Sequence, residues 1–246
     1  MPPAEFSNPR LVALYDRLNP LGADSDFYLE AAAELQAHKV IDVACGTGLL
    51  TGEFAKRGHA VVGLDRESAM LDIARARPHG RDVAWILGDA PELTSSDADL
   101  VVMTGHAAQA FLDDAHWQQT LASMHAALRP NGHLLFETRN PPAKGWLRWT
   151  KANTLREVQD DAGDTVTVWT EVLATTANRV QFATHYVWKA SGEELFSENT
   201  IAFRSEEELR RSLHEAGFAV EQVYGNWDSS PVRMTSPELI FVAKRR

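Results

Sequence analysis

Two acidic residues flank a glycine-containing turn near residue 45, and their spacing suits the binding of a nucleoside. Asp42 lies inside the apolar run 40–43, four residues before Gly46, where a carboxylate is costly without a cation or several hydrogen-bond donors. Gly46 and Gly48 allow a ligand to approach the main chain closely. Asp65 ends a second apolar run 19 residues after Gly46, an offset at which an acid can hold a ribose diol.

The residues around this turn favour a cationic ligand over a dinucleotide. The dinucleotide fingerprint G-x-G-x-x-G/A needs a small residue three places after Gly48, but Thr51 stands there and Gly52 comes one place late. Asp42 would also bring negative charge close to a pyrophosphate. S-adenosylmethionine (SAM) has no phosphate and carries an ammonium and a sulfonium, so an acid near the turn suits it. The alternatives are a nicotinamide-dependent oxidoreductase and a tight turn without a ligand.

Four ordered motifs resemble those of the class I SAM-dependent methyltransferases. The segment DVACGTG at residues 42–48 is similar to the first family motif, D-x-G-C-G-T-G, with Ala44 in place of the first glycine. Asp65 matches the ribose-binding acid of the family, GDA at 88–90 matches its third motif, and LRPNGHLLF at 128–136 matches its L-x-P-G-G turn. The resemblance covers about residues 38–140 and resumes from about 205 to the end.

The resemblance implies a SAM cofactor and a set of residues that hold it. Asp65 is expected to hold the ribose hydroxyls, Asp89 to face the adenine amino group, and Tyr15 to close the cofactor side from an N-terminal helix. A protein that binds SAM without turnover is a further alternative. The full set of expected cofactor-binding residues is Tyr15, Asp42, Ala44, Gly46, Gly48, Asp65, Arg66, Met70, Gly88, Asp89, Ala90 and Met103.

Two residues are candidates for catalysis of methyl transfer. A neutral amine acceptor needs alignment only, whereas a hydroxyl or a carbon acid needs a base. His106 follows the fourth expected strand, where the family places acceptor-facing residues; it could instead be a loop histidine bonded to the main chain. Glu137 could bind an acceptor cation or form an ion pair with Arg139. Three tryptophans could shape an aromatic pocket or pack in the core: Trp146, Trp149 and Trp227.

Composition narrows the class of partner. The chain has 246 residues, 44% of them hydrophobic, so one sizeable α/β core can form. A net charge of −10 disfavours nucleic acid as a partner, and no apolar run approaches a membrane span. Cys45 is the only cysteine, and no Cys, His and Asp cluster has metal-site spacing, so no metal is expected. Without a signal pattern, the prediction is a cytoplasmic enzyme acting on a small-molecule acceptor.

The order of elements predicts the fold class. Alternating strand and helix patterns from 39 to 138 predict a parallel sheet. Three runs with period-two alternation then follow at 164–173, 179–189 and 195–203, without helices between them. We therefore expect an α/β fold, a Rossmann-like seven-stranded class I methyltransferase sheet with an inserted antiparallel β cap.

The expected domain division follows this change of pattern. Residues 1–140 and 204–246 are assigned to the SAM-binding domain and residues 141–203 to the cap, at the sheet edge where open α/β folds bind ligands. The chain also resembles a small-molecule methyltransferase subgroup with a β-rich insertion, through its N-terminal Tyr15-Asp16 pair and the segment YGNWDSSP at 224–231. If the cap strands lay on the far edge, their aromatic faces would instead form a homodimer interface.

Overall fold

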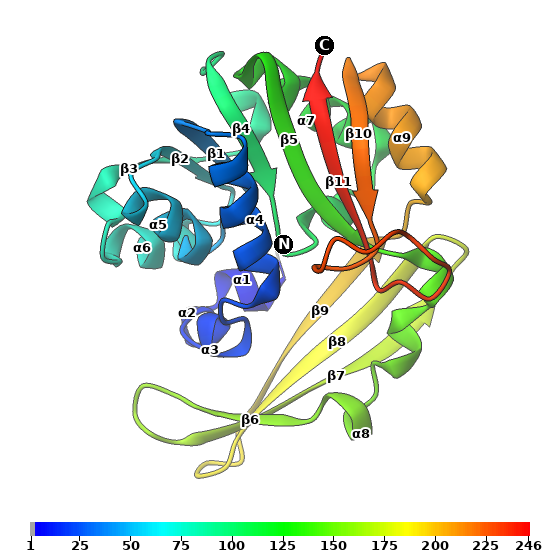
Figure 1. Cartoon of the computed structure of the whole chain (residues 1–246). Helices are drawn as coiled ribbons and strands as arrows, with labels where there is room; N and C mark the ends of the chain where they lie inside the picture. The colour runs from blue at the N-terminus through cyan, green and yellow to red at the C-terminus, as the bar shows by residue number, and fades with distance from the viewer. Residues whose placement is uncertain (1–2) are drawn as a thin grey trace.

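The computed structural model describes residues 3–246 and contains two β-sheets that share one junction. The larger sheet has seven strands in the order β10-β11-β5-β4-β1-β2-β3, and the smaller has four in the order β6-β7-β8-β9. Figure 1 shows the smaller sheet beyond the carboxyl ends of β4 and β5, with the N-terminal helices beside it. The expected α/β fold class is therefore confirmed, and the antiparallel strands form a separate sheet.

Five parallel strands joined by βα units run from the middle of the larger sheet to its β3 edge. The apolar runs of β1, β2, β4 and β5 are mostly buried, as expected for strands covered on both faces, whereas the edge strand β3 is partly exposed. The strands are β1 Lys39–Val43, β2 Ala60–Asp65, β3 Val83–Leu87, β4 Ala98–Met103 and β5 Leu128–Arg139. The connecting helices are α5 Leu49–Lys56, α6 Ser68–Ala76 and α7 Asp114–Ala127. Short 3-10 turns η1 Gly80–Asp82, η2 Ala90–Glu92 and η3 Ala107–Ala110 follow α6, β3 and β4.

The last two strands complete the larger sheet as an antiparallel hairpin, and the helix α9, Glu206–Glu215, precedes them. The α9 helix begins with a capping box of Ser205 and Glu208. The strand β11, Glu238–Arg245, pairs antiparallel with β5 on one side and with β10, Phe218–Tyr224, on the other. This register places Glu238, the first residue of β11, opposite Arg139, the last residue of β5.

The N-terminal region differs from its prediction in one respect. The sequence of residues 8–36 predicts two helical pieces with a break at 19–22, and the structure has this break between α3 and α4. The first piece, however, consists of three single-turn helices, because Asn8 caps the second of them and Pro9 follows. These helices are α1 Ala4–Ser7, α2 Pro9–Val12 and α3 Tyr15–Leu18, and the longer α4 spans Ala23–Glu34.

The smaller sheet has one strand more than the three expected. The additional strand is β6, Arg156–Gln159, which pairs antiparallel with β7 at the edge of the sheet. Polar and charged residues make up most of β6, so no alternation marked it in the sequence. The expected strands are present as β7 Thr165–Thr175, β8 Arg179–Trp188 and β9 Glu194–Ala202. They follow two 3-10 turns and a short helix: η4 Pro141–Ala143, η5 Gly145–Arg148 and α8 Lys151–Thr154.

Three apolar clusters hold these layers together. Helices α7 and α9 pack on one face of the larger sheet and helices α4 and α5 on the other. The third cluster joins the N-terminal helices to the smaller sheet, through Leu11, Leu14 and Leu18 against Tyr186 and Trp188. The N-terminal segment is thus fixed between the two sheets. Within residues 3–246 the structure contains no helix that combines the length and apolar character needed to cross a bilayer.

Candidate functional site

The turn between β1 and α5 contains a buried acid with an unused oxygen. Asp42 is 1% exposed, and its Oδ2 accepts a hydrogen bond from the Thr51 hydroxyl at 2.6 Å. Its Oδ1 has no hydrogen-bond partner among residues 3–246. Burial raises the pKa of the Asp42 carboxyl to about 7. A buried acceptor without a donor is costly, so this oxygen fits a ligand that supplies a positively charged donor.

The main chain of the same turn leaves space for a ligand. Gly46 has φ +56°, and a Cβ built there would meet no atom within 4 Å. Gly48 also has positive φ, but its Cβ would lie 2.6 Å from the Trp85 ring. Gly48 is therefore required by packing, whereas Gly46 borders open space. Ala44, the departure from the family motif, adopts φ +59° without glycine.

Asp65 lies at the adjacent strand end and is bonded to this turn. Its Oδ2 accepts from the Gly46 N–H at 2.8 Å, and its Oδ1 accepts from the Glu67 N–H at 2.9 Å. The residue is 8% exposed, and burial raises the pKa of its carboxyl above the ordinary value. Each carboxylate oxygen can accept a second hydrogen bond, so the two remain able to receive ribose hydroxyls.

The other expected cofactor residues divide into an exposed pair and a buried group. Asp89 lies after β3, where it caps η2 and accepts from Arg66 at 3.2 Å. Both side chains are accessible at the carboxyl edge of the sheet. The side chains of three expected residues are instead within the core, so contact with a ligand would require their main chain: Met70, Ala90 and Met103. Gly88 has φ +155°, and a Cβ there would press against Glu92.

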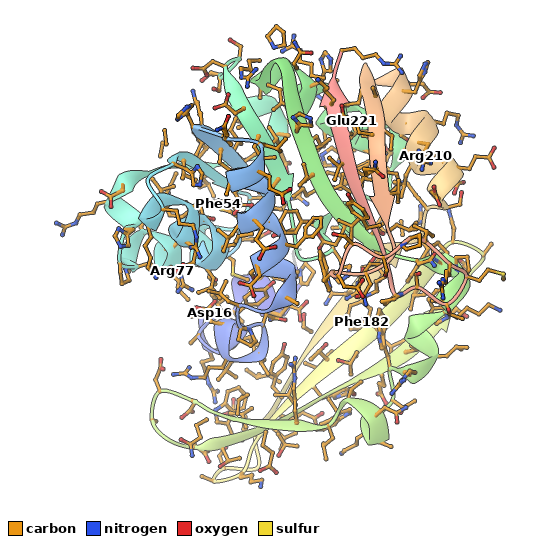
Figure 2. All side chains as sticks on the ribbon, in the orientation of Figure 1. Asp16, Phe54, Arg77, Phe182, Arg210 and Glu221 are labelled. Atoms are coloured by element: carbon orange, nitrogen blue, oxygen red, sulfur yellow. The ribbon has the colours of Figure 1, made fainter. Side chains whose placement is uncertain are left out.

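The N-terminal segment closes over this turn through contacts that the sequence did not indicate. Asp16 accepts from the Thr47 hydroxyl at 2.6 Å and from the Arg77 guanidinium, which also donates to the Thr47 carbonyl at 2.6 Å. Figure 2 shows Asp16 and Arg77 next to one another below α6. Burial, with the nearby charges of Glu5 and Asp65, raises the pKa of the Tyr15 hydroxyl. Tyr15 therefore lies near Asp65, and its expected contact with a cofactor stays a prediction.

A second cluster of side chains lies where β4 and β5 end. His106 has φ +59°, a strained conformation for a residue with a side chain. Its main-chain N–H donates to Glu137 Oε1 at 2.6 Å, and its Nε2 lies 2.9 Å from Glu238 Oε2. The Tyr28 hydroxyl donates to the other Glu137 oxygen. Glu137 is 2% exposed, and burial raises the pKa of its carboxyl.

This geometry distinguishes the two candidate catalytic residues. With Nε2–H donating to Glu238, the His106 Nδ1 carries a lone pair and can accept a proton. Glu137 uses both oxygens on donors of the protein itself, which favours the positioning of His106 over contact with an acceptor. The alternative pairing of Glu137 with Arg139 is absent among residues 3–246, and the Arg139 guanidinium donates to Gln109 Oε1 at 2.9 Å.

Sequence reasoning missed two members of this cluster, Tyr28 and Glu238. Glu238 follows Pro237 and opens the apolar run of β11, so a buried acid at the start of a strand was a usable signal. No comparable signal marks Tyr28, which is a buried aromatic residue within α4. Among residues 3–246, no three His, Cys, Asp or Glu side chains are grouped to hold a metal ion.

A cavity lies where the end of β5 meets the smaller sheet, between Arg139 and residues of β6, β7 and β8. Its volume is about 320 Å³, and Trp149 and Phe182 form part of its wall with ring centroids 4.9 Å apart. Figure 2 shows Phe182 at the junction between the two sheets. Trp146 instead packs against Phe203, and Trp227 packs against the aromatic residues of α4. Of the three candidate tryptophans, Trp149 is the one that lines this cavity.

Comparison with known protein families identifies the central region. Residues 40–132 match a family model described as a methyltransferase domain. Demethylmenaquinone methyltransferase from Deinococcus radiodurans is 38% identical over 141 residues, which cover 53% of this chain and 58% of that protein. The match therefore spans little more than half the length of this curated relative.

Two solved structures share the whole architecture. The CcbJ methyltransferase from Streptomyces caelestis has a TM-score of 0.78 at 18% identity, with 96% of each chain covered. A SAM-bound amino pentose methyltransferase from Micromonospora echinaspora has a TM-score of 0.71 at 23% identity, covering 94% of this chain and 95% of that one. At these identities the likeness concerns the fold, which here includes the smaller sheet.

Proposed function

Because the chain belongs to the class I SAM-dependent methyltransferases, we propose that it transfers a methyl group from SAM to a small-molecule acceptor. The observation that carries this proposal is the unpartnered Asp42 Oδ1 beside the open Gly46 turn. A buried acid next to an open main-chain turn fits a ligand with an ammonium group better than one with a pyrophosphate.

The cofactor is held by the carboxyl ends of the first three strands. The Gly46 turn contacts the methionine part, and Asp42 receives its ammonium. Asp65 accepts from the ribose hydroxyls while its bonds to Gly46 and Glu67 keep the carboxylate in place. Asp89 accepts from the adenine amino group, and Tyr15 covers this side. When bound, SAM supplies an electrophilic methyl group on a sulfonium that leaves as a neutral thioether.

The acceptor is aligned by the cluster at the ends of β4 and β5. For a hydroxyl acceptor, the His106 Nδ1 accepts the proton as the oxygen bonds to the methyl carbon. Glu238 holds the ring and balances the positive charge that the imidazole gains, as the acid of a catalytic triad does. An amine acceptor in its neutral form needs only the alignment. We also propose that residues 141–203 form a cap that covers the acceptor and excludes water.

Calorimetric titration tests the cofactor assignment. Wild-type protein should bind SAM, and NADH should give no heat of binding. Gly46→Val places a side chain in the open space of the turn and should abolish SAM binding. Gly58→Val is the matched control, because Gly58 has φ +87°, borders equally open space and lies at the opposite edge of the sheet. Circular dichroism tests whether both variants fold.

Three outcomes separate the alternatives. If Gly46→Val still binds SAM, the SAM pocket lies elsewhere and the assignment of the Gly46 turn to the cofactor is refuted. NADH binding at the same turn supports an oxidoreductase. SAM binding without S-adenosylhomocysteine formation, across a panel of hydroxyl and amine acceptors, supports a binding protein without turnover. Whether the enzyme forms a homodimer stays a prediction that sedimentation tests.

A further inference from the structure

The cavity between the two sheets contains two arginines that form no ion pair with a carboxylate among the described residues. Eight residues line it, and its two charged members, Arg139 and Arg156, are both arginines. The whole chain has a net charge of −10, with 34 acidic residues against 24 basic ones. The charge of the cavity lining is therefore opposite in sign to the net charge of the molecule.

Neither arginine has a carboxylate partner within residues 3–246. Arg139 donates to the Gln109 side chain, and its guanidinium lies 5.1 Å from the centroid of the Trp149 ring. Arg156 donates to the Leu18 carbonyl at 2.7 Å. A guanidinium has five N–H donors, so most donors of both groups are free. Burial lowers the pKa of the Arg139 guanidinium, which is partly removed from water without an ion-pair partner, whereas Arg156 is exposed.

The nearest acids cannot compensate for this charge by direct pairing. Glu137 and Glu238 are close enough to raise the pKa of Arg139 in part, but both already bind other groups. Glu137 accepts from Tyr28 and His106, and Glu238 holds the His106 ring. The free donors of Arg139 therefore remain available to a ligand in the cavity.

The β5–β11 register connects the cavity to the reacting position. Arg139 lies directly opposite Glu238, so their side chains project from the same face with Cβ atoms about 5 Å apart. Glu238 in turn contacts His106. A ligand anchored on Arg139 would have to extend past Glu238 to reach His106, which does not line the cavity, while Trp149 and Phe182 offer an aromatic wall to its body.

We propose that the methyl acceptor carries an anionic group, a carboxylate or a phosphate, which Arg139 and Arg156 bind in this cavity. The inference rests on the proposed methyl transfer for its substrate role, but the anion site is a physical property of the free protein. Planar guanidinium groups suit both anions, since each presents two oxygens to the N–H fork. The rest of the acceptor is apolar and flat, to match the aromatic wall.

The test uses three probes that share one ring: benzoate, phenyl phosphate and the neutral benzyl alcohol. Binding to the full chain without cofactor is followed through the indole N–H resonance of Trp149 in NMR spectra. At least one charged probe should bind about tenfold more tightly than benzyl alcohol, and its affinity should fall as salt rises. Comparison of benzoate with phenyl phosphate identifies which anion the site prefers.

Two variants and one control assign the effect to the arginines. Arg139→Gln and Arg156→Gln should each weaken the charged probe about tenfold, and neither should change benzyl alcohol binding. Arg179→Gln is the matched control, because Arg179 also donates to one main-chain carbonyl but lies outside the cavity. The Arg156 side chain is exposed, so we expect Arg156→Gln to fold even if Arg139→Gln does not.

The proposal fails if benzyl alcohol binds as tightly as both anions, if no probe shifts the Trp149 resonance, or if the arginine variants keep full affinity. SAM titration of the same proteins separates this failure from failure of the proposed function. Retained SAM binding with no anion site leaves the methyltransferase assignment intact. If the protein binds the anionic probes but does not bind SAM, the anion site is real but its ligand is not a methyl acceptor.

Discussion

Glu238 Oε2 lies 2.9 Å from Nε2 of His106, although 132 residues separate them in the chain. Glu238 is the first residue of β11, and His106 lies in the strained turn after β4. The contact selects the ring tautomer with a proton on Nε2 and a free lone pair on Nδ1. The contact thereby holds the His106 ring in one orientation, with Nδ1 free to accept a hydrogen bond.

The first prediction concerns this positioning role of Glu238. Glu238→Ala should allow both neutral tautomers of His106, which ¹⁵N NMR of the ring distinguishes, and should slow transfer to a hydroxyl acceptor about 100-fold. SAM affinity should not change. Glu221→Ala is the matched control, because Glu221 holds His133 at 3.1 Å on the far side of the sheet. If His106 has only the Nε2–H tautomer in both the wild type and Glu238→Ala, the positioning role of Glu238 is contradicted.

The second prediction concerns the pH dependence of stability. The folded Asp42 carboxyl has a pKa of about 7, above the unfolded value of about 3.9, so the folded state retains a proton that the unfolded state loses. The contribution of Asp42 is thus most favourable below pH about 4 and declines as the pH rises to about 7. Asp42→Asn removes this decline. In urea unfolding, the variant should therefore gain stability relative to wild type between pH 5 and pH 8.

Asp97→Asn serves as the control for this measurement. Asp97 is fully exposed, and its pair with Lys39 lowers the pKa of its carboxyl, so its contribution is constant over the same range. If the difference between Asp42→Asn and wild type is equally constant, the buried carboxyl is ionised throughout and the prediction is wrong.

The third prediction concerns the ribose-binding role of Asp65. Asp65→Ala should weaken SAM binding at least about tenfold, because hydrogen bonds to a charged group contribute about 1.5–3 kcal/mol and the Gly46 turn also loses its support. Asp72→Ala, which removes an exposed acid from the neighbouring helix α6, should leave the affinity unchanged. Calorimetry gives both values. Equal affinity in wild type and Asp65→Ala would disprove the assignment.

The fourth prediction concerns the N-terminal segment over the cofactor turn. Arg77→Ala removes the ion pair with Asp16 and the bond to the Thr47 carbonyl. Amide hydrogen exchange of residues 3–18 should accelerate, and SAM should dissociate faster, because this segment covers the site. Arg75→Ala breaks only an exposed pair in the last turn of α6, two residues before Arg77, and is the control. Unchanged exchange in Arg77→Ala would show that the apolar cluster alone holds the segment.

The sequence by itself determined the features that depend on short stretches of chain. The strand, turn and helix around residues 42–48 follow from an apolar run, two glycines and a helical pattern, all within reach of local conformational preference. The βα alternation and the offset of Asp65 set the parallel sheet and its cofactor edge. The change to period-two alternation after residue 163 predicted the antiparallel strands for the same local reason.

Only the tertiary structure decided which distant side chains meet. The Glu238 contact with His106, the Asp16 contact with Arg77 and the approach of Arg139 to the smaller sheet depend on register and on packing between elements far apart in the chain. Short elements were not predicted from the sequence for a related reason. Strand β6 has four residues and little alternation, and its pairing with β7 stabilises it more than its own sequence does. Local patterns specify elements, whereas the charge and geometry of a site arise where several elements end together.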